Sequence, residues 1–166
     1  MEKTQKHTIS VLVENQAGVL SKVVGLFSRR GFNIDSLAVG ETENPNLSRM
    51  TIVVTGTRYT VDQIEKQVSK LVPVKRVKAL KPGEHISRAL ILFKLKSTPE
   101  TRGEIMKTAE EWGAKAEDET SSTIILEFTG TSKQTRELQE LLKPHILEVV
   151  RTGRIAVEKC AERLNS

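Results

Sequence analysis

One short stretch near the start of the chain combines residues that could bind a small polar molecule. Glu14-Asn15-Gln16-Ala17-Gly18 follows an alternating apolar segment at residues 7–13 and precedes a segment with helical spacing. Gly18 allows a ligand to approach the backbone, and the start of a helix offers unpaired N–H groups and a favourable dipole to a carboxylate. The Asn15 side-chain amide can hydrogen-bond an ammonium group or a carboxylate. Together these properties suit an amino acid.

Neighbouring residues complete this candidate site. Val19, Leu20 and Ile34 offer an aliphatic wall, Asn33 offers a second amide at the start of the next strand, and Ser21 lies one residue deeper in the helix. We therefore expect a small aliphatic amino acid as the ligand, with Asn33 reaching the turn of a neighbouring chain in a dimer. The same residues also fit an ordinary structure, in which Asn15 caps the helix and the glycines form turns. The residues alone leave both interpretations open.

Residues that could perform catalysis are scattered along the chain. The sequence contains no Gly-rich phosphate loop, no metal-ligand spacing and no nucleophile motif, and its three histidines lie far apart. Glu14 and Asp35 flank the first predicted helix and could act as acid and base or hold a metal, although carboxylates beside turns are more often solvated or capping groups. We therefore predict no catalytic residue and no metal site.

The candidate site must be positioned by the elements around it. The apolar spacing predicts strands at residues 7–13, 33–39, 50–55 and 74–80. Apolar residues recur at helical spacing after Gly18 and again after Thr60, which stands three residues before Gln63 as in a capping box. Gly31 occupies the place of a left-handed helix C-cap. The order is βαββαβ over residues 7–81.

The second half of the chain repeats this pattern after Lys81-Pro82-Gly83-Glu84. Strands are predicted at residues 89–95, 123–129 and 146–150, a helix is expected after Thr98, and Gly130-Thr131 matches Gly56-Thr57. The copy is weakest at residues 115–122, and residues 152–157 indicate one more hairpin-like segment. We therefore predict an α+β protein with two ferredoxin-like βαββαβ domains, at residues 1–81 and 82–166. Each has two helices on one face of an antiparallel sheet.

The predicted topology also favours a dimer. Each half is small and buries limited apolar surface on its own. The strand order of such a unit leaves its second strand on an edge, and here that strand carries Ile34 and Leu37. We expect this edge to pair with a second copy through the N-terminal domain.

Composition and the remaining residues exclude other classes. RNA-recognition modules share the βαββαβ order but stack bases on aromatics of their first and third strands, and residues 8–13 and 50–54 contain none, so we predict no nucleic-acid partner despite a net charge of +5. No apolar run approaches the roughly 20 residues of a membrane span. Cys160 is the single cysteine and has no nearby histidine, and the polar start has no signal-peptide character. We expect a cytoplasmic protein that does not associate with a membrane.

Several stretches resemble the small subunits of acetolactate synthase. The turn and helix start fit the N-x-x-G-x-L pattern of an ACT domain, and more diagnostic stretches are Arg30-Gly31-Phe32-Asn33-Ile34-Asp35-Ser36-Leu37 and Leu47-Ser48-Arg49-Met50-Thr51-Ile52. The similarity continues to Glu148-Val149-Val150-Arg151-Thr152-Gly153 and so covers nearly the whole chain. The second half is similar to the C-terminal, ACT-like domain of that family.

The resemblance implies a regulatory role. Such subunits pair their N-terminal ACT domains side by side and bind valine at the interface, which places the effector on residues of the turn and helix start and of the partner's edge strand: Asn15, Gly18, Val19, Leu20, Ser21, Asn33 and Ile34. It also implies that this chain activates a catalytic large subunit and that valine, or else leucine or isoleucine, reverses the activation. Thiamine diphosphate, magnesium and FAD are expected on that catalytic subunit, and no cofactor on this chain.

Two features depart from this picture or qualify it. Ala17 stands where relatives often carry Ser, which removes a possible hydroxyl contact, and the turn at residues 98–103 lacks the N-x-x-G pattern. We therefore expect no equivalent effector site in the second half. The alternative function is a free-standing ACT sensor that regulates another enzyme of amino-acid metabolism.

Overall fold

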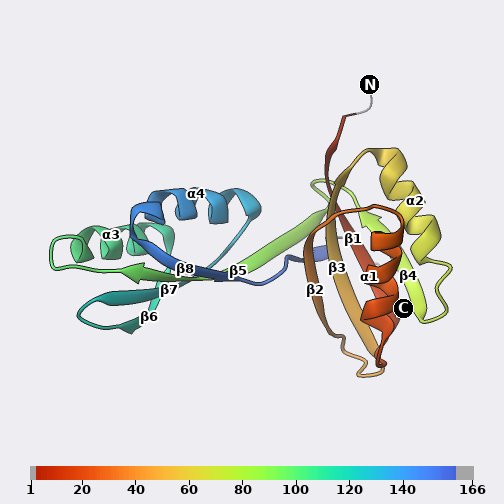
Figure 1. The fold of residues 1–166 in the computed structure, drawn as a ribbon, viewed down its shortest axis with the longest axis horizontal. Helices are drawn as coiled ribbons and strands as arrows, with labels where there is room; N and C mark the ends of the chain where they lie inside the picture. The colour runs from red at the N-terminus through yellow and green to blue at the C-terminus, as the bar shows by residue number, and fades with distance from the viewer. Residues whose placement is uncertain (1–2, 160–166) are drawn as a thin grey trace. The chain divides into compact units, whose positions relative to one another are not determined.

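The computed structural model describes residues 3–159, and their contacts divide the chain into two units (Figure 1). The first unit contains the residues up to Ser87 together with those from Gly153 onward, and the second is Arg88–Thr152. The sequence pattern placed the boundary after residue 81 and assigned all later residues to the second domain. The described segment from Gly153 to Lys159 instead groups with the first unit. Cys160 lies outside the described residues.

The first unit has the predicted βαββαβ order, which confirms the fold class. Its elements are β1 (Gln5–Glu14), α1 (Val19–Arg29), β2 (Ile34–Glu41), β3 (Leu47–Gly56), α2 (Arg58–Val68) and β4 (Val74–Leu80). The antiparallel sheet has the order β2-β3-β1-β4, with both helices on one face (Figure 1). β2 is therefore an edge strand, as expected.

The core of the first unit lies between this sheet and its helices. β1 and β3 pair over their full length, so that Ile9 faces Ile52 and Val11 faces Met50. All four side chains are buried with Phe27 of α1 in one aliphatic cluster. Because residues on a strand alternate between faces, this register places every second residue of β1 and β3 beneath the helices.

The start of α2 corrects the predicted cap. The helix begins at Arg58, and Thr57 is its N-cap, with a side-chain oxygen that accepts the N–H of Thr60 at 3.2 Å. Thr60 was predicted to be the cap, and that assignment is wrong. Two threonines three residues apart can each cap a helix, and the end of β3 at Gly56 selects the earlier one.

The second unit repeats the same architecture. Its elements are β5 (His85–Lys96), α3 (Arg102–Trp112), β6 (Lys115–Glu119), β7 (Thr123–Gly130), α4 (Ser132–Leu142), the 3₁₀ turn η1 (Lys143–His145) and β8 (Ile146–Arg151). The sheet order β6-β7-β5-β8 matches that of the first unit. A last strand, β9 (Ile155–Glu158), lies in the segment that groups with the first unit and pairs with β5, whose first residues also belong to that unit. β6 occupies the stretch where the sequence copy was weakest, and it is a short, charged and largely exposed edge strand. Within the described residues no helix is long and apolar enough to cross a membrane.

The fully buried Ile52 provides a test of the first core. We expect Ile52→Ala to lower the free energy of unfolding by about 2–5 kcal/mol, because the cavity left in a packed core adds to the lost burial. Val72→Ala is the control, since Val72 is 90% exposed. Urea unfolding followed by circular dichroism measures both, and equal midpoints for the two variants would contradict this assignment of the core.

Candidate functional site

The predicted turn lies between the end of β1 and the start of α1. Gly18 is the N-cap of α1 and has a left-handed backbone, with φ of 83° and ψ of −7°. No side chain caps the helix, and a Cβ at Gly18 would have no heavy atom within 4 Å. The helix start is thus open to solvent, and capping by Asn15, the ordinary structural alternative, is not what the structure shows.

Asn15 instead ties the turn to the loop between β2 and β3. Its Nδ2 donates to the carbonyl of Pro45 at 2.9 Å and to Oε1 of Glu41 at 3.3 Å. Its backbone N–H donates to the carbonyl of Asn46 at 2.8 Å. The side chain is exposed, so these bonds hold an amide at the surface beside the open helix start.

The sequence did not identify Glu41, Pro45 and Asn46 as part of this site. Their turn chemistry predicted a loop, but no local pattern shows which distant turn a loop touches. The contact depends on the pairing of Glu14 with Leu47, which brings the β2–β3 loop beside the β1–α1 turn. The contact between this loop and this turn therefore depends on the register of two strands far apart in the sequence, which residue spacing within one segment does not reveal.

The apolar residues after Gly18 divide between core and surface. Val19 is buried in the core cluster, whereas Leu20 is 43% exposed and Ser21 lies at the surface. Of these two apolar residues, Leu20 therefore offers exposed surface to a ligand at the helix start of a single copy.

Asn33 and Ile34 lie at the opposite end of the sheet from the turn. Ile34 pairs with Val54 at the far end of β3, whereas Glu41, at the other end of β2, pairs with Ser48. At about 3.3 Å per residue, β2 separates these two groups by roughly 23 Å. One chain thus brings Asn15, Gly18, Leu20 and Ser21 together, but it does not bring Asn33 and Ile34 to them.

The two carboxylates considered as an acid–base pair are also separated. Glu14 forms an ion pair with Lys75, 2.5 Å between Oε1 and Nζ, at one end of the sheet. Asp35 accepts a hydrogen bond from Thr55 at 2.5 Å near the other end. Among residues 3–159 no three His, Cys, Asp or Glu side chains gather where they could hold a metal ion.

The three histidines contact backbone or sit at the periphery. Nε2 of His7 lies 3.2 Å from the carbonyl of Gly56, and Nδ1 of His85 lies 2.8 Å from the carbonyl of Lys81. His145 is 4.0 Å from a carboxylate oxygen of Glu104. These positions belong to separate parts of the fold, so the structure assembles no constellation for acid–base catalysis from them.

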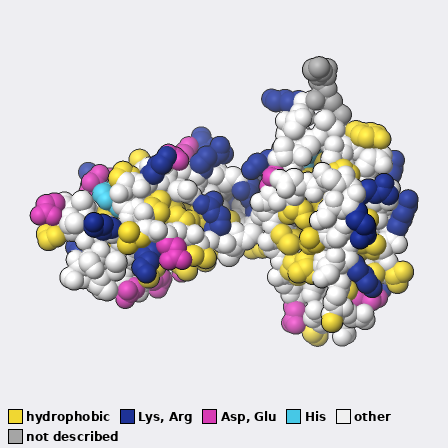
Figure 2. All heavy atoms as spheres, in the orientation of Figure 1, with side chains coloured by type: hydrophobic (Ala, Val, Ile, Leu, Met, Phe, Trp, Pro, Cys, Tyr) yellow, Lys and Arg dark blue, Asp and Glu magenta, His cyan; other side chains and the backbone are white. Residues whose placement is uncertain are grey.

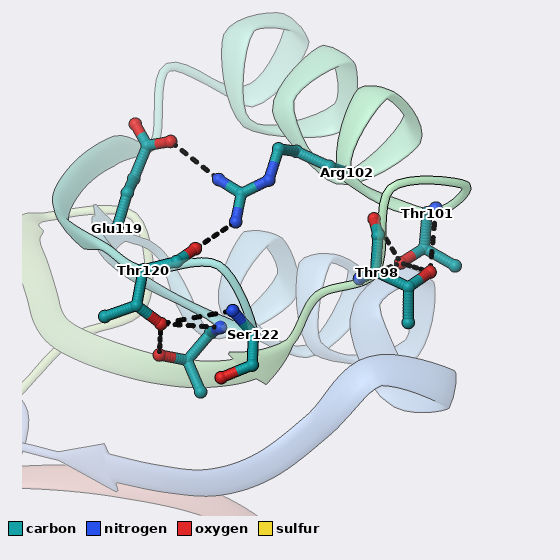
Figure 3. Close-up of polar contacts among 7 residues, drawn as sticks. Thr98, Thr101, Arg102, Glu119, Thr120 and Ser122 are labelled. Atoms are coloured by element: carbon teal, nitrogen blue, oxygen red, sulfur yellow. Dashed lines mark hydrogen bonds and ion pairs between the residues drawn. The ribbon is translucent and has the colours of Figure 1, made fainter.

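The corresponding turn of the second unit is closed by its own side chains (Figure 3). The hydroxyls of Thr98 and Thr101 lie 3.1 Å apart, and each bonds a backbone N–H of the other residue. Arg102 reaches over to Glu119, at 2.9 Å, and to the carbonyl of Thr120. This turn therefore differs chemically from the open start of α1.

Comparisons with known proteins show the family of the chain. Residues 9–76 match the family described as the acetohydroxyacid synthase small subunit-like ACT domain, and residues 88–160 match the small subunit of acetolactate synthase. A probable acetolactate synthase small subunit of Archaeoglobus fulgidus is 43% identical over 153 residues, which cover 92% of this chain and 96% of that protein. The chain belongs to the acetolactate synthase small subunit family.

Two further relatives extend the match. The acetolactate synthase small subunit of Mycolicibacterium smegmatis is 41% identical over 157 residues, covering 94% of this chain and 92% of that one. The crystal structure of the acetolactate synthase small subunit from Thermotoga maritima superimposes with a TM-score of 0.89 at 38% identity, covering 95% of this chain and 99% of that chain. The family and the fold of two ACT-like units are thereby established.

The left-handed backbone at Gly18 generates a direct prediction. We expect Gly18→Ala to lower the free energy of unfolding by about 1–2 kcal/mol, because a Cβ strains a left-handed residue even where space is open. Gly18→Asn should cost less, since Asn tolerates this conformation. Gly103→Ala in α3 is the control and should be neutral or stabilising. Urea denaturation measures the free energy of unfolding of the three variants. A Gly18→Ala protein as stable as the wild type would contradict the left-handed backbone at this residue.

Proposed function

We propose that this chain is a non-catalytic, regulatory small subunit of cytoplasmic acetolactate synthase that senses valine through its first unit. The observation that carries the proposal is the open start of α1 at Gly18, beside the fixed amide of Asn15. Family membership favours this function over a free-standing sensor of another pathway. The proposed effector site is completed only when two copies associate.

The topology of the first sheet supports such a dimer. Among the described strands β2 pairs with β3 alone, so its outer edge is available. If two copies pair β2 antiparallel about a two-fold axis, Ile34 of one copy comes opposite Glu41 of the other. Because Glu41 accepts from Asn15, this pairing brings Asn33 and Ile34 of one copy to the turn of the second. The two half-sites lie roughly 23 Å apart within one chain. In this dimer each half-site would instead meet the complementary half-site of the other copy.

The surface beside β2 is suited to burial against a second copy. Figure 2 shows apolar side chains gathered at the surface of the first unit around β2, where Val39 is 45% exposed. Leu20 at the start of α1 is similarly exposed, and Ile34 and Leu37 are partly buried. Removing such surface from water stabilises association by about 25 cal/mol per Å² before the entropic costs of binding.

The proposed ligand contacts follow from the chemistry of the two half-sites. The N–H of Val19 donates to the carbonyl of Gln16, so the carboxylate of valine would accept from the N–H groups that follow it in the first turn of α1, with the helix dipole favouring its charge. The amides of Asn15 and Asn33 would bind the ammonium and carboxylate groups, and Leu20 and Ile34 would enclose the side chain. One methylene is worth about 1 kcal/mol, so leucine and isoleucine would bind within a small energy gap of valine.

The proposed regulation is a coupling between two binding events. The dimer would raise the activity of a catalytic large subunit, on which thiamine diphosphate, magnesium and FAD would reside, and valine would reverse this effect. A coupling free energy of about 1–3 kcal/mol changes affinity roughly 5–150-fold. By linkage, the catalytic subunit would change the affinity for valine by the same factor.

Calorimetric titration of the chain with valine tests the site. We expect saturable binding of valine that Asn15→Ala weakens at least about tenfold, because a hydrogen bond to a charged group is worth roughly 1.5–3 kcal/mol. Gln63→Ala on α2 is the control and should bind like the wild type. In activity assays with the catalytic subunit of the same organism, Asn15→Ala should still activate but should lose its response to valine.

Two outcomes would contradict this proposal. Absence of binding by valine, leucine and isoleucine alike would remove the proposed effector. Binding of valine that changes neither the activity of the catalytic subunit nor its affinity would remove the proposed regulation while leaving the site intact.

The proposed dimer has its own test at β2. Val39→Lys places a charge at the proposed apolar interface, so we expect a dimer to become a monomer in sedimentation velocity at micromolar concentration. Val72→Lys is the matched control, because the same charge is added at a side chain already 90% exposed. A Val39→Lys protein that remains dimeric with unchanged circular dichroism would exclude β2 as the dimer edge.

A further inference from the structure

The sheet of the first unit is buried on both faces, although its helices cover only one. On the face opposite the helices, Ser10 and Leu12 of β1 are 1% and 4% exposed, and Thr51 and Val53 of β3 are 2% and 3% exposed. An antiparallel sheet with helices on a single side leaves its other face to water. Another segment of the chain must therefore contribute to covering these residues.

That segment is residues 153–159, which we call the strap. Lys78 pairs with Ser10 in register, so its side chain belongs to the face opposite the helices. Its Nζ lies 2.8 Å from Oε1 of Glu158, whose side chain is only 15% exposed. The N–H of Lys159 donates to the carbonyl of Glu84 at 2.9 Å, and Ala156 is buried. These contacts fix one end of the strap near β4.

The other end of the strap lies against the middle of the edge strand β2. A Cβ added to Gly153 would stand 1.9 Å from the carbonyl oxygen of Leu37, 2.3 Å from its carbonyl carbon and 2.8 Å from the nitrogen of Ala38. All three atoms belong to one peptide group, so Gly153 lies flat against that peptide. No larger residue fits there without displacing backbone.

The residue after Gly153 adds a hydrogen bond to the same strand. The N–H of Arg154 donates to Oγ of Ser36 at 2.8 Å. Burial lowers the pKa of the Arg154 guanidinium, as expected for a segment that packs against the sheet. Burial likewise lowers the pKa of Arg49 on β3, and the carboxylates of Glu43 and Glu158 partly oppose that effect. Glu158 of the strap thus acts on both β3 and β4.

Through these contacts the strap packs against the face of β2 and leaves its outer edge unpaired among the described strands. β2 is hydrogen-bonded along one side by β3, and the strap touches its face at residues 36–38, midway between its two ends. In the proposed dimer that midpoint lies at the two-fold axis, and the two ends of β2 form the two effector sites. A shift of the strap would therefore move both half-sites together.

We propose that the strap positions β2 for effector binding, with Gly153 and Ser36 as its positioning residues. This inference rests on the proposed function and deepens it. Affinity for valine then depends on a segment that does not touch valine. By linkage, bound valine must hold the strap more tightly to the sheet.

Gly153→Ala in the full chain tests the positioning role. We expect valine affinity, measured by calorimetry, to fall at least about tenfold, and amide hydrogen exchange to rise in β2 and in the strap. Amides in the centre of β1 and β3 should stay protected. Gly103→Ala is the matched control, because a Cβ there meets nothing within 4 Å, and it should leave both measurements unchanged.

Ser36 supplies a milder variant in case Gly153→Ala does not fold. We expect Ser36→Ala to weaken valine binding about threefold and Ser36→Thr to restore it, because the hydroxyl that accepts from Arg154 is retained. A reciprocal measurement needs no variant: saturating valine should slow exchange at residues 153–159 of the wild-type protein.

The outcomes separate this inference from the proposed function. A wild-type chain that binds no valine overturns both. A wild-type chain that binds valine, together with folded Gly153→Ala and Ser36→Ala proteins of unchanged affinity, overturns the strap proposal alone. Unchanged exchange in the strap on saturation with valine also overturns it.

Discussion

The unbroken antiparallel pairing of β1 with β3 is the constraint on which the rest of the first unit depends. Gln5 pairs with Gly56 and Glu14 with Leu47, with no irregularity between. A slip of one residue would turn the side chains of one strand to the opposite face relative to the other strand, and both faces of this sheet are buried. The same register places the β2–β3 loop beside the β1–α1 turn, so the position of the candidate site follows from the core.

In the proposed dimer, the edge position of β2 would make ligand binding depend on two copies. Its two ends carry different halves of the candidate site, and the length of the strand keeps them apart within one chain. The proposed two-fold axis through the middle of the strand would join each half to its complement from the other copy. Ligand binding would thus depend on the geometry of the dimer interface. A regulatory subunit needs such a dependence in order to pass a signal to its partner.

The sequence predicted most of the fold because strand and helix periodicities are local. Alternation at Ile9, Val11 and Val13 and the repeated Gly-Thr pairs were enough to give two βαββαβ units. It placed the α2 cap one turn late, since two threonines fit the same pattern. It did not predict the bonds of Asn15 to the β2–β3 loop or the return of Gly153 to Leu37, because both join residues far apart in the sequence. The latter contact agrees with the grouping of residues 153–159 with the first unit.

The two units test how much of the candidate site is due to the fold itself. They share strand order and helix placement, and neither α1 nor α3 has a side-chain hydrogen bond at its N-cap, but the side chains around the two turns differ. In the second, Thr98 and Thr101 bond each other's backbone, and Arg102 spans the turn to Glu119 and Thr120. A ligand there would meet these hydrogen-bonded side chains, whereas a Cβ at Gly18 would have no heavy atom within 4 Å. The difference between the units therefore lies in a few side chains at one turn, and the fold supplies only the place where such a site can form.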